Sequence, residues 1–209
     1  MAQQLHTFPP DPVSYLVPSW EDLDAICVEL AQKITQTGQK FDRIIALAKG
    51  GWPFAKSLVD LLDIPEVASI GVRFYSGINQ RLDQPEIYQD LPIAVRGEHV
   101  LLFDDVADTG ESLLFTKEHL LAQGVASVTT ATLYYKPQSK IVPDYYGEQT
   151  SAWIVYPFDK REGMGLLQAK WADEQLSLDE LTARFRTMGI APAAIDFFRT
   201  LQKTKDVSA

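Results

Sequence analysis

An apolar run passes into an acidic loop at residues 100–112, which read VLLFDDVADTGES. The run from Val100 to Phe103 has the composition of a buried strand. Two adjacent carboxylates follow it, Asp104 and Asp105, and then come small residues, a hydroxyl, a glycine and the start of a helical pattern. In open α/β sheets, ligands bind beyond the carboxyl ends of the strands. We therefore expect a binding site at this loop.

The residue types in this loop suit a ligand with two chemically different ends. Backbone N–H groups of residues 107–112 can form a concave anion site, helped by the N-terminus of the following helix. Thr109 and Ser112 add hydroxyl donors, and Gly110 lets the backbone approach a phosphate closely. The paired carboxylates instead suit vicinal hydroxyls and a hydrated Mg²⁺. A phosphate at one end and a diol near a metal at the other would satisfy both halves of the loop.

Other acidic or glycine-rich motifs do not fit the spacing. An EF-hand needs acidic residues at alternate positions before its glycine, and Val106 interrupts that pattern. The sequence contains neither the Walker A motif nor Gly-x-Gly-x-x-Gly. A solvated acidic turn after a strand remains as the structural alternative.

Strand-like and helical patterns alternate along the chain. Helical spacing of apolar residues predicts helices over 19–34, with Ser19 as N-cap, over 54–62 and over 111–123. The other strand-like runs are 44–47, 68–74, 127–135 and 153–156. This alternation predicts an α/β fold with a mainly parallel, twisted sheet covered by helices on both faces.

The two ends of the chain differ from this middle part. Four of the twelve prolines lie in the first 18 residues, which predicts an extended arm over 1–18. A capping box at Ser177 and Glu180, and a second helical pattern over 192–203, predict a helical C-terminal extension over 166–209. We expect this extension to pack on the core or on a partner subunit rather than to perform chemistry.

Composition limits the class of protein. The net charge of −9 argues against a nucleic-acid partner, whose binding surface would be basic. Cys27 is the only cysteine, which excludes an internal disulfide and a multi-cysteine zinc site. No apolar run reaches the roughly 18 residues that span a membrane, and the N-terminus lacks the features of a signal peptide. We expect a cytoplasmic protein that needs Mg²⁺ if its substrate is a polyphosphate.

Three further segments carry groups that bind anions or bases. Lys49, Gly50 and Gly51 follow a predicted strand, where their N–H groups and one ammonium can meet an anion. The polar stretch 75–85 has the length of a mobile lid, and its Arg81 can clamp phosphate oxygens. Lys136 follows another strand and can donate to an exocyclic oxygen of a base. Taken singly, each also fits an ordinary turn, a surface loop or a solvated lysine.

The loop at 100–112 resembles the phosphoribosyl pyrophosphate signature of type I phosphoribosyltransferases. The resemblance implies that Asp104 and Asp105 hold the ribose hydroxyls and the metal. It also implies that Asp108, Thr109, Gly110, Glu111 and Ser112 hold the 5′-phosphate. Asp108 would further face the purine imidazole, as a general base or as a stabiliser of positive charge. Lys49, Gly50 and Gly51 would form the pyrophosphate loop, with a cis peptide bond before or after Gly50.

The later part of the chain resembles bacterial xanthine-guanine phosphoribosyltransferases. Lys136-Pro137 is followed, some fifteen residues on, by WIVYPFD at 153–159, and Asn-Gln-Arg at 79–81 is similar to their catalytic loop. The resemblance implies that Lys136 contacts O6, Trp153 stacks on the base and backbone groups of Ile154 read its 2-position. It places Asp159 near a second metal ion or the base. The likeness covers about residues 15–165, and the shortest family members have no counterpart of the tail beyond.

These resemblances define the expected function. We expect residues 19–165 to form a type I phosphoribosyltransferase domain with a small hood that binds the base. The enzyme would join a 6-oxopurine to the ribose 5-phosphate of phosphoribosyl pyrophosphate, with Asp108, Arg81 and Lys49 in catalytic roles, Mg²⁺ as cofactor, and a homo-oligomer, dimer or tetramer, as assembly. Two alternatives are a phosphoribosyltransferase for another base and a non-catalytic regulator of the same fold. Lys136 argues against adenine, whose 6-amino group is a donor.

Overall fold

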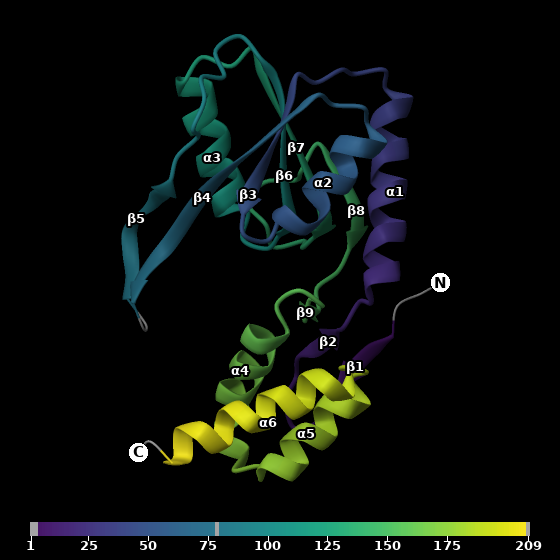
Figure 1. The fold of residues 1–209 in the computed structure, drawn as a ribbon, viewed down its shortest axis with the longest axis vertical. Coiled ribbons are helices and arrows are strands. Elements are labelled where there is room, and N and C mark those ends of the chain that lie inside the picture. The colour runs from purple at the N-terminus through teal and green to yellow at the C-terminus, as the bar shows by residue number, and fades with distance from the viewer. Residues whose placement is uncertain (1–3, 78–79, 208–209) are drawn as a thin grey trace. The chain divides into compact units, whose positions relative to one another are not determined.

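The computed structural model describes residues 4–77 and 80–207, with the backbone alone at 74–77, 80–84 and 205–207 (Figure 1). The chain forms two compact units. Residues 23–151 make the first, which we call the sheet unit. Residues 1–22 and 152–209 make the second, which we call the helical unit. The predicted arm and the predicted C-terminal extension both fall in the helical unit, together with residues 152–165.

The sheet unit is built on a mainly parallel sheet, as the sequence predicts. Its strand order is β5-β4-β3-β6-β7-β8, and every neighbouring pair is parallel except β4 and β5. The strands are β3 (Arg43–Ala48), β4 (Glu66–Gly77), β5 (Gln80–Gln89), β6 (His99–Ala107), β7 (Ser127–Tyr135) and β8 (Tyr145–Gln149).

Three helices flank this sheet. They are α1 (Trp20–Gln36), α2 (Trp52–Leu61) and α3 (Glu111–Ala122), and α3 lies on the opposite side of the strands from α1 and α2 (Figure 1). The predicted N-cap of α1 is confirmed, because the Asp22 N–H donates to Ser19 Oγ at 3.0 Å and the Ser19 N–H donates back to Asp22 Oδ2 at 2.8 Å. Each of the three predicted helices therefore forms within two residues of its expected bounds.

Both faces of the central strands are buried, which explains their near-continuous apolar sequence. Ile45 of β3 and Leu102 of β6 pack in one apolar cluster with Leu113 and Leu120 of α3. Their neighbours in sequence point to the opposite face of the sheet, since side chains alternate along a strand, and they are equally buried. Ile44, Ala46, Leu101 and Phe103 are each 1% exposed or less.

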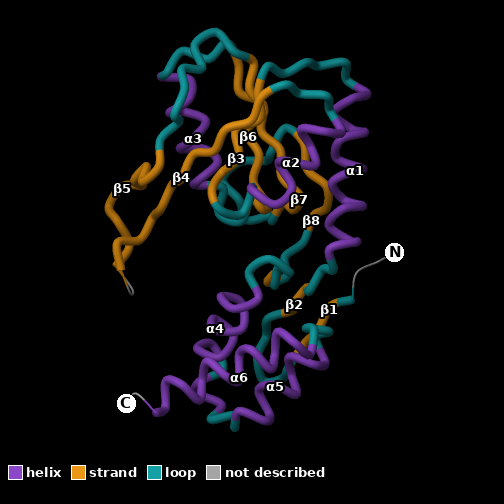
Figure 2. The backbone as a smooth tube through the Cα atoms, in the orientation of Figure 1, coloured by secondary structure: helices purple, strands orange, loops and turns teal. Residues whose placement is uncertain are grey.

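The predicted polar loop at 75–85 is wrong as secondary structure. β4 runs to Gly77 and β5 begins at Gln80, so the backbone forms a two-stranded antiparallel ribbon that projects from the sheet (Figure 2). Cross-strand pairs near its base stabilise the ribbon. Arg73 Nη2 lies 2.9 Å from Glu86 Oε2, and the ring of Tyr88 covers Gly71, where a Cβ atom would lie 2.4 Å from the ring. The side chain of Arg81 lies outside the described residues.

The helical unit joins both ends of the chain. Its small sheet has the order β1-β2-β9, in which β1 and β2 are antiparallel and β2 and β9 are parallel. The predicted strand 153–156 is shorter in the structure, because Asp159 N–H donates to Tyr156 O at 3.2 Å and turns the chain after Pro157. The elements are β1 (Leu5–Thr7), β2 (Ser14–Leu16), β9 (Trp153–Ile154), α4 (Lys160–Lys170), the short 3₁₀ helix η1 (Ala172–Glu174), α5 (Leu178–Thr187) and α6 (Pro192–Val207).

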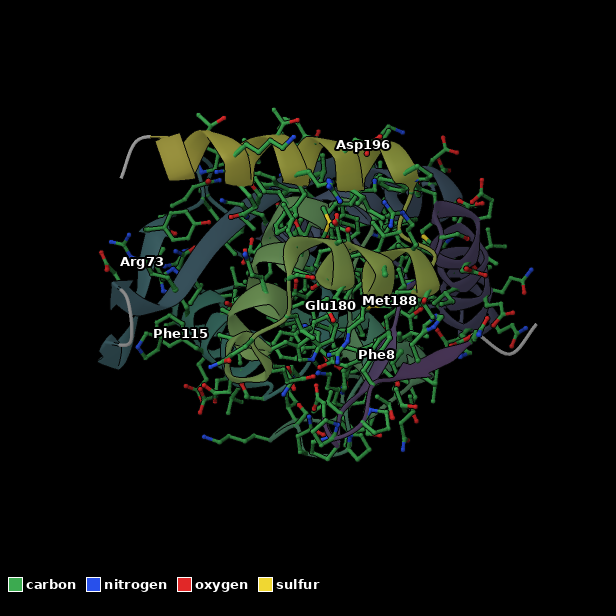
Figure 3. All side chains as sticks on the ribbon, turned by 90° about the horizontal axis from the view of Figure 1, so that it is seen from below. Phe8, Arg73, Phe115, Glu180, Met188 and Asp196 are labelled. Atoms are coloured by element: carbon green, nitrogen blue, oxygen red, sulfur yellow. The ribbon has the colours of Figure 1, made fainter. Side chains whose placement is uncertain are left out.

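An apolar cluster of its own holds the helical unit together. Tyr15 of β2 is fully buried in it, with Trp171 after α4, Phe185 of α5 and Phe198 of α6. Figure 3 looks onto the sides of α5 and α6, with Glu180 on α5, Met188 directly after it and Asp196 on α6. The predicted capping box is confirmed, because Glu180 N–H donates to the Ser177 hydroxyl at 3.2 Å and Ser177 N–H donates to the Glu180 carboxylate at 2.8 Å. Over residues 4–77 and 80–207, no helix has the length and apolar character needed to cross a membrane.

Candidate active site

The candidate site lies where three neighbouring parallel strands end. β3, β6 and β7 are adjacent in the sheet, so the segments that follow them meet at one edge. After β3 come residues 49–51, after β6 come residues 108–112, and after β7 comes the segment 136–141. The structure thus brings together the predicted pyrophosphate loop, the predicted phosphate loop and Lys136.

The paired carboxylates sit on the end of β6 rather than in a loop. The sequence predicts a strand that ends at Phe103, but ladder pairing continues from Asp104 with Thr132 to Ala107 with Tyr135. Asp104 and Asp105 are therefore held on a rigid element. Burial, and then the neighbouring Asp105 carboxylate, raise the pKa of the Asp104 carboxyl well above its usual range, although the Asp105 N–H donates to Asp104 Oδ1 at 2.9 Å.

The two glycines after β3 allow a close approach to this acidic strand end. A Cβ atom at Gly50 would lie 2.4 Å from Asp105 Oδ1, and one at Gly51 would lie 2.6 Å from the Phe103 carbonyl oxygen. Neither position has room for a side chain. The expected cis peptide bond is present, but it joins Ala48 to Lys49, one bond earlier than predicted. The side chain of Lys49 is exposed to solvent.

The phosphate loop turns into α3 through Gly110. This residue is the N-cap of α3 and has a φ of +75°, in the left-handed region that favours glycine. The Glu111 N–H lies 3.4 Å from Thr109 Oγ1, and Leu114 N–H donates to the Gly110 carbonyl to begin the helix. Residues 109–112 therefore present a helix N-terminus, which favours an anion, at the edge where β3, β6 and β7 end.

The segment after β7 contributes residues that the sequence analysis missed. Lys136 Nζ lies 3.0 Å from Asp108 Oδ2, and Gln138 Nε2 donates to Asp108 Oδ1 at 2.9 Å. Lys140 Nζ donates to Glu111 Oε1 at 2.6 Å, and the Lys140 N–H donates to the Thr109 carbonyl at 2.8 Å. The sequence signal for Gln138 and Lys140 is the polar turn Pro-Gln-Ser-Lys at 137–140, which follows the predicted strand and Lys136.

The remaining predicted base-binding residues belong to the helical unit. Trp153 and Ile154 form β9, which pairs in register with Tyr15 and Leu16 of β2. The Trp153 and Tyr15 rings form a tilted pair with centroids 6.3 Å apart, and Trp153 is partly exposed. Asp159 directly precedes α4, and its carbonyl accepts from the Gly163 N–H at 2.8 Å.

Comparison with known proteins identifies the family. The family described as "Phosphoribosyl transferase domain" matches residues 19–159, about two thirds of the chain. The chain belongs to the phosphoribosyltransferase family. All of the predicted site residues, from Lys49 to Asp159, lie inside the matched region.

Individual phosphoribosyltransferases match over the same part. Xanthine-guanine phosphoribosyltransferase of Idiomarina loihiensis is 30% identical over 143 residues, which cover 68% of this chain and 84% of that protein. The protein of the same name from Gluconobacter oxydans is 28% identical and covers 72% of this chain and 88% of its own. The solved purine phosphoribosyltransferase of Pyrococcus horikoshii is 33% identical with a TM-score of 0.62, over 69% of this chain and 93% of that one.

The acidic strand end of this phosphoribosyltransferase fits a hard divalent cation. Mg²⁺ is usually held by one or two carboxylates, with waters and substrate oxygens completing the octahedron. Asp104 and Asp105 supply two adjacent carboxylates. Burial first, and then the charge of Asp105, raise the pKa of Asp104, and a bound cation would offset both effects. In the described part of the chain, no three His, Cys, Asp or Glu side chains are arranged to hold a metal ion by themselves.

Proposed function

We propose that this phosphoribosyltransferase transfers the 5-phosphoribosyl group from phosphoribosyl pyrophosphate to a 6-oxopurine and releases pyrophosphate. The observation that carries the proposal is the placement of Asp108. Its carboxylate is fixed by Lys136 and Gln138 at the edge where the phosphate loop begins. A carboxylate beside an ammonium is complementary to a 6-oxopurine. The carboxylate can accept from the imidazole N–H or balance its positive charge, and the ammonium can donate to the 6-oxo group.

The sugar and its phosphate would bind along the end of β6. N–H groups and hydroxyls of residues 109–112 hold the 5′-phosphate at the N-terminus of α3. Asp104 and Asp105 accept hydrogen bonds from the ribose hydroxyls and hold Mg²⁺, which offsets the charge of the pyrophosphate when it is bound. The backbone of Gly50 and Gly51 lies against this strand end and meets the pyrophosphate.

The reaction is a displacement at C1 of the ribose. The bond from C1 to the pyrophosphate oxygen breaks, and a bond from C1 to a purine ring nitrogen forms. Lys49 and Arg81 offset the charge on the leaving pyrophosphate, and Asp108 takes the proton from the imidazole ring or balances its positive charge. Lys136 donates to O6, while Trp153 stacks on the base and Ile154 reads its 2-position. Asp159 adds a contact to the base or to a second metal ion.

The names of the relatives support a 6-oxopurine as acceptor. Curated relatives are named xanthine-guanine or hypoxanthine-guanine phosphoribosyltransferase, the latter in Streptococcus thermophilus at 29% identity over 126 residues. All three bases in these names carry an oxygen at position 6. The position of Lys136 suits that oxygen and disfavours the 6-amino group of adenine.

The test is pyrophosphate release from phosphoribosyl pyrophosphate and Mg²⁺, with guanine, xanthine, hypoxanthine, adenine, uracil and orotate supplied separately. We expect turnover with at least one 6-oxopurine and its loss when a chelator removes the metal. Asp108→Asn should lower kcat by roughly 10²-fold or more, the usual contribution of an acid–base group. Asp60→Asn makes the same charge change at an exposed residue of α2 and should leave kcat unchanged.

Two outcomes would contradict the proposal. Turnover confined to adenine, uracil or orotate would assign another base. Binding of phosphoribosyl pyrophosphate without turnover of any base would point to a regulator that has lost the reaction.

A further inference from the structure

The loop at 108–112, which we propose binds the 5′-phosphate, carries a carboxylate of its own. Glu111 is the first residue of α3, between Gly110 and Ser112, and its side chain is 19% exposed. A phosphate monoester carries a charge of about −1.5 to −2 near neutral pH. Both anions are drawn to the same helix N-terminus, and like charges at short range repel each other. The loop therefore needs a compensating cation.

Lys140 supplies that cation from outside the loop. Its Nζ donates to Glu111 Oε1 at 2.6 Å, at the short end of the range for charge-assisted hydrogen bonds. The Lys140 side chain is itself 62% exposed, so burial does not force the pairing. The ammonium is held beside the loop by the backbone that carries it.

The turn that carries Lys140 is built against the loop. Lys140 N–H donates to the Thr109 carbonyl at 2.8 Å, and Ser139 N–H donates to the Lys136 carbonyl at 2.9 Å. The Ser139 hydroxyl donates to the Ile141 carbonyl at 2.8 Å. A Cβ atom at Gly110 would lie only 2.3 Å from the Ser139 hydroxyl oxygen. Lys140 is thus fixed to the phosphate loop at its backbone as well as at its side chain.

We propose that Lys140 neutralises Glu111 and so keeps the loop able to accept the 5′-phosphate of its substrate. Lys140 is a positioning residue that acts through Glu111, and the inference rests on the proposed function of this loop. Its effect should be specific for the phosphate end of a ligand. Removing the Lys140 ammonium takes away this positive charge and increases the repulsion between the Glu111 carboxylate and the phosphate, whereas removing both charges restores the balance.

The test compares four variants of the full-length protein: Lys140→Met, Lys140→Arg, Glu111→Gln and the double variant Lys140→Met/Glu111→Gln. Calorimetry gives the Kd for phosphoribosyl pyrophosphate with Mg²⁺, for guanosine 5′-monophosphate and for guanosine, which lacks the phosphate. We expect Lys140→Met to weaken the binding of both phosphate ligands about tenfold, because the repulsion between Glu111 and the phosphate increases when the ammonium is removed. Guanosine should bind as in the wild type, and the double variant should bind the phosphate ligands within about threefold of wild type.

Controls separate this role from a structural one. Lys117→Met removes the same charge from α3, where Lys117 lies 3.9 Å from Asp144, and should leave all three Kd values unchanged. Lys140→Arg keeps the charge and should bind like the wild type. Far-ultraviolet circular dichroism and thermal unfolding establish that each variant folds.

Three results would overturn the inference. The first is that Lys140→Met leaves every Kd unchanged, and the second is that it weakens guanosine binding as much as phosphate-ligand binding. The third is that the double variant binds the phosphate ligands as weakly as Lys140→Met, which would mean that Lys140 contacts the phosphate directly. Absence of any phosphate-ligand binding by the wild type would overturn it too. The turnover assay tests the proposed function separately from this inference. If the enzyme turns over but the variants do not show the expected Kd changes, only the inference about Lys140 is wrong. If the variants show these changes but no base is turned over, only the proposed enzymatic activity is wrong.

Discussion

At the scale of single residues, the phosphate loop depends on a glycine for two separate reasons. Gly110 has a φ of +75°, which costs an L-residue roughly 1–2 kcal/mol. A side chain there would also collide with the Ser139 hydroxyl and with Ile141. The first reason concerns the turn into α3, and the second concerns the approach of the segment 136–141, which carries Lys136 and Lys140.

Gly110→Ala should therefore lower the free energy of unfolding by more than the cost of the left-handed backbone alone. We expect a fall of about 3 kcal/mol in the free energy of unfolding, because overpacking adds to the cost of the left-handed backbone. The KM for phosphoribosyl pyrophosphate should rise, since the loop has to move away from Ser139. Gly97→Ala is a matched control in the same unit. Gly97 has a φ of +79° with open space around it, so this variant should lose only about 1–2 kcal/mol and keep its KM. Equal losses for both variants, measured by urea unfolding, would argue against the close approach.

At the scale of elements, the sequence predicts most of what periodicity and chemistry encode locally. The helices at 19–34 and 111–123 and the strands at 100–103 and 127–135 carry strong local signals, and the structure confirms them. The sequence also indicates the acidic loop, because carboxylates, hydroxyls and a glycine in this order suit one kind of ligand.

The misses have physical causes that no local pattern reports. The β4–β5 ribbon is polar along much of its length, so apolar periodicity does not mark it, and pairing between strands forms it. β8 carries four partly exposed residues and only weak alternation. The polar turn at 137–140 marks the neighbourhood of Gln138 and Lys140 but not their contacts. Their partners Asp108 and Glu111 are about thirty residues away in sequence and meet them only when β6 and β7 pair.

A buried carboxylate ties the N-terminal strands to the helices of the same unit. Asp11 accepts hydrogen bonds from the Tyr15 hydroxyl, from Trp171 Nε1 at 2.9 Å and from the Val13 N–H at 3.0 Å. Lys170 Nζ lies 3.4 Å away, and the Asp11 side chain is 5% exposed. Burial alone would raise the pKa of Asp11, but these donors outweigh it and lower the pKa to about 2.

This pKa gives an acid dependence with a defined sign. The folded-state pKa lies below the unfolded value of about 3.9, so Asp11 contributes stability above about pH 4 that is lost as the pH falls towards 2. Asp11→Asn should cost about 2 kcal/mol at pH 7 and show a flatter decline of unfolding free energy between pH 4 and pH 2. Asp179→Asn, at a side chain that is 82% exposed, is the control and should change stability by less than about 1 kcal/mol. Parallel acid profiles for wild type and Asp11→Asn would exclude this role.

At the scale of the whole molecule, the family match and the compact units do not share a boundary. The match ends at residue 159, yet nine of the eleven buried residues in the cluster of the helical unit come after it, all except Tyr15 and Val155. Trp153 packs against the same cluster. The segment proposed to bind the base is therefore supported by a tail that the family match does not include.

A chain that ends after residue 159 tests this dependence. Without α4, α5 and α6, Tyr15 and Val155 lose their apolar cover, and a cluster of two buried residues cannot offset the entropy of ordering the strands. We expect β1, β2 and β9 to lose protection in hydrogen exchange and the truncated protein to bind a hydrophobic dye. β3, β6 and β7 should stay protected, because the sheet unit keeps its own cluster with α3. Binding of phosphoribosyl pyrophosphate should persist while binding of the base is lost. Retained protection in β2 and β9 would instead make the tail an accessory to a base-binding segment that folds without it.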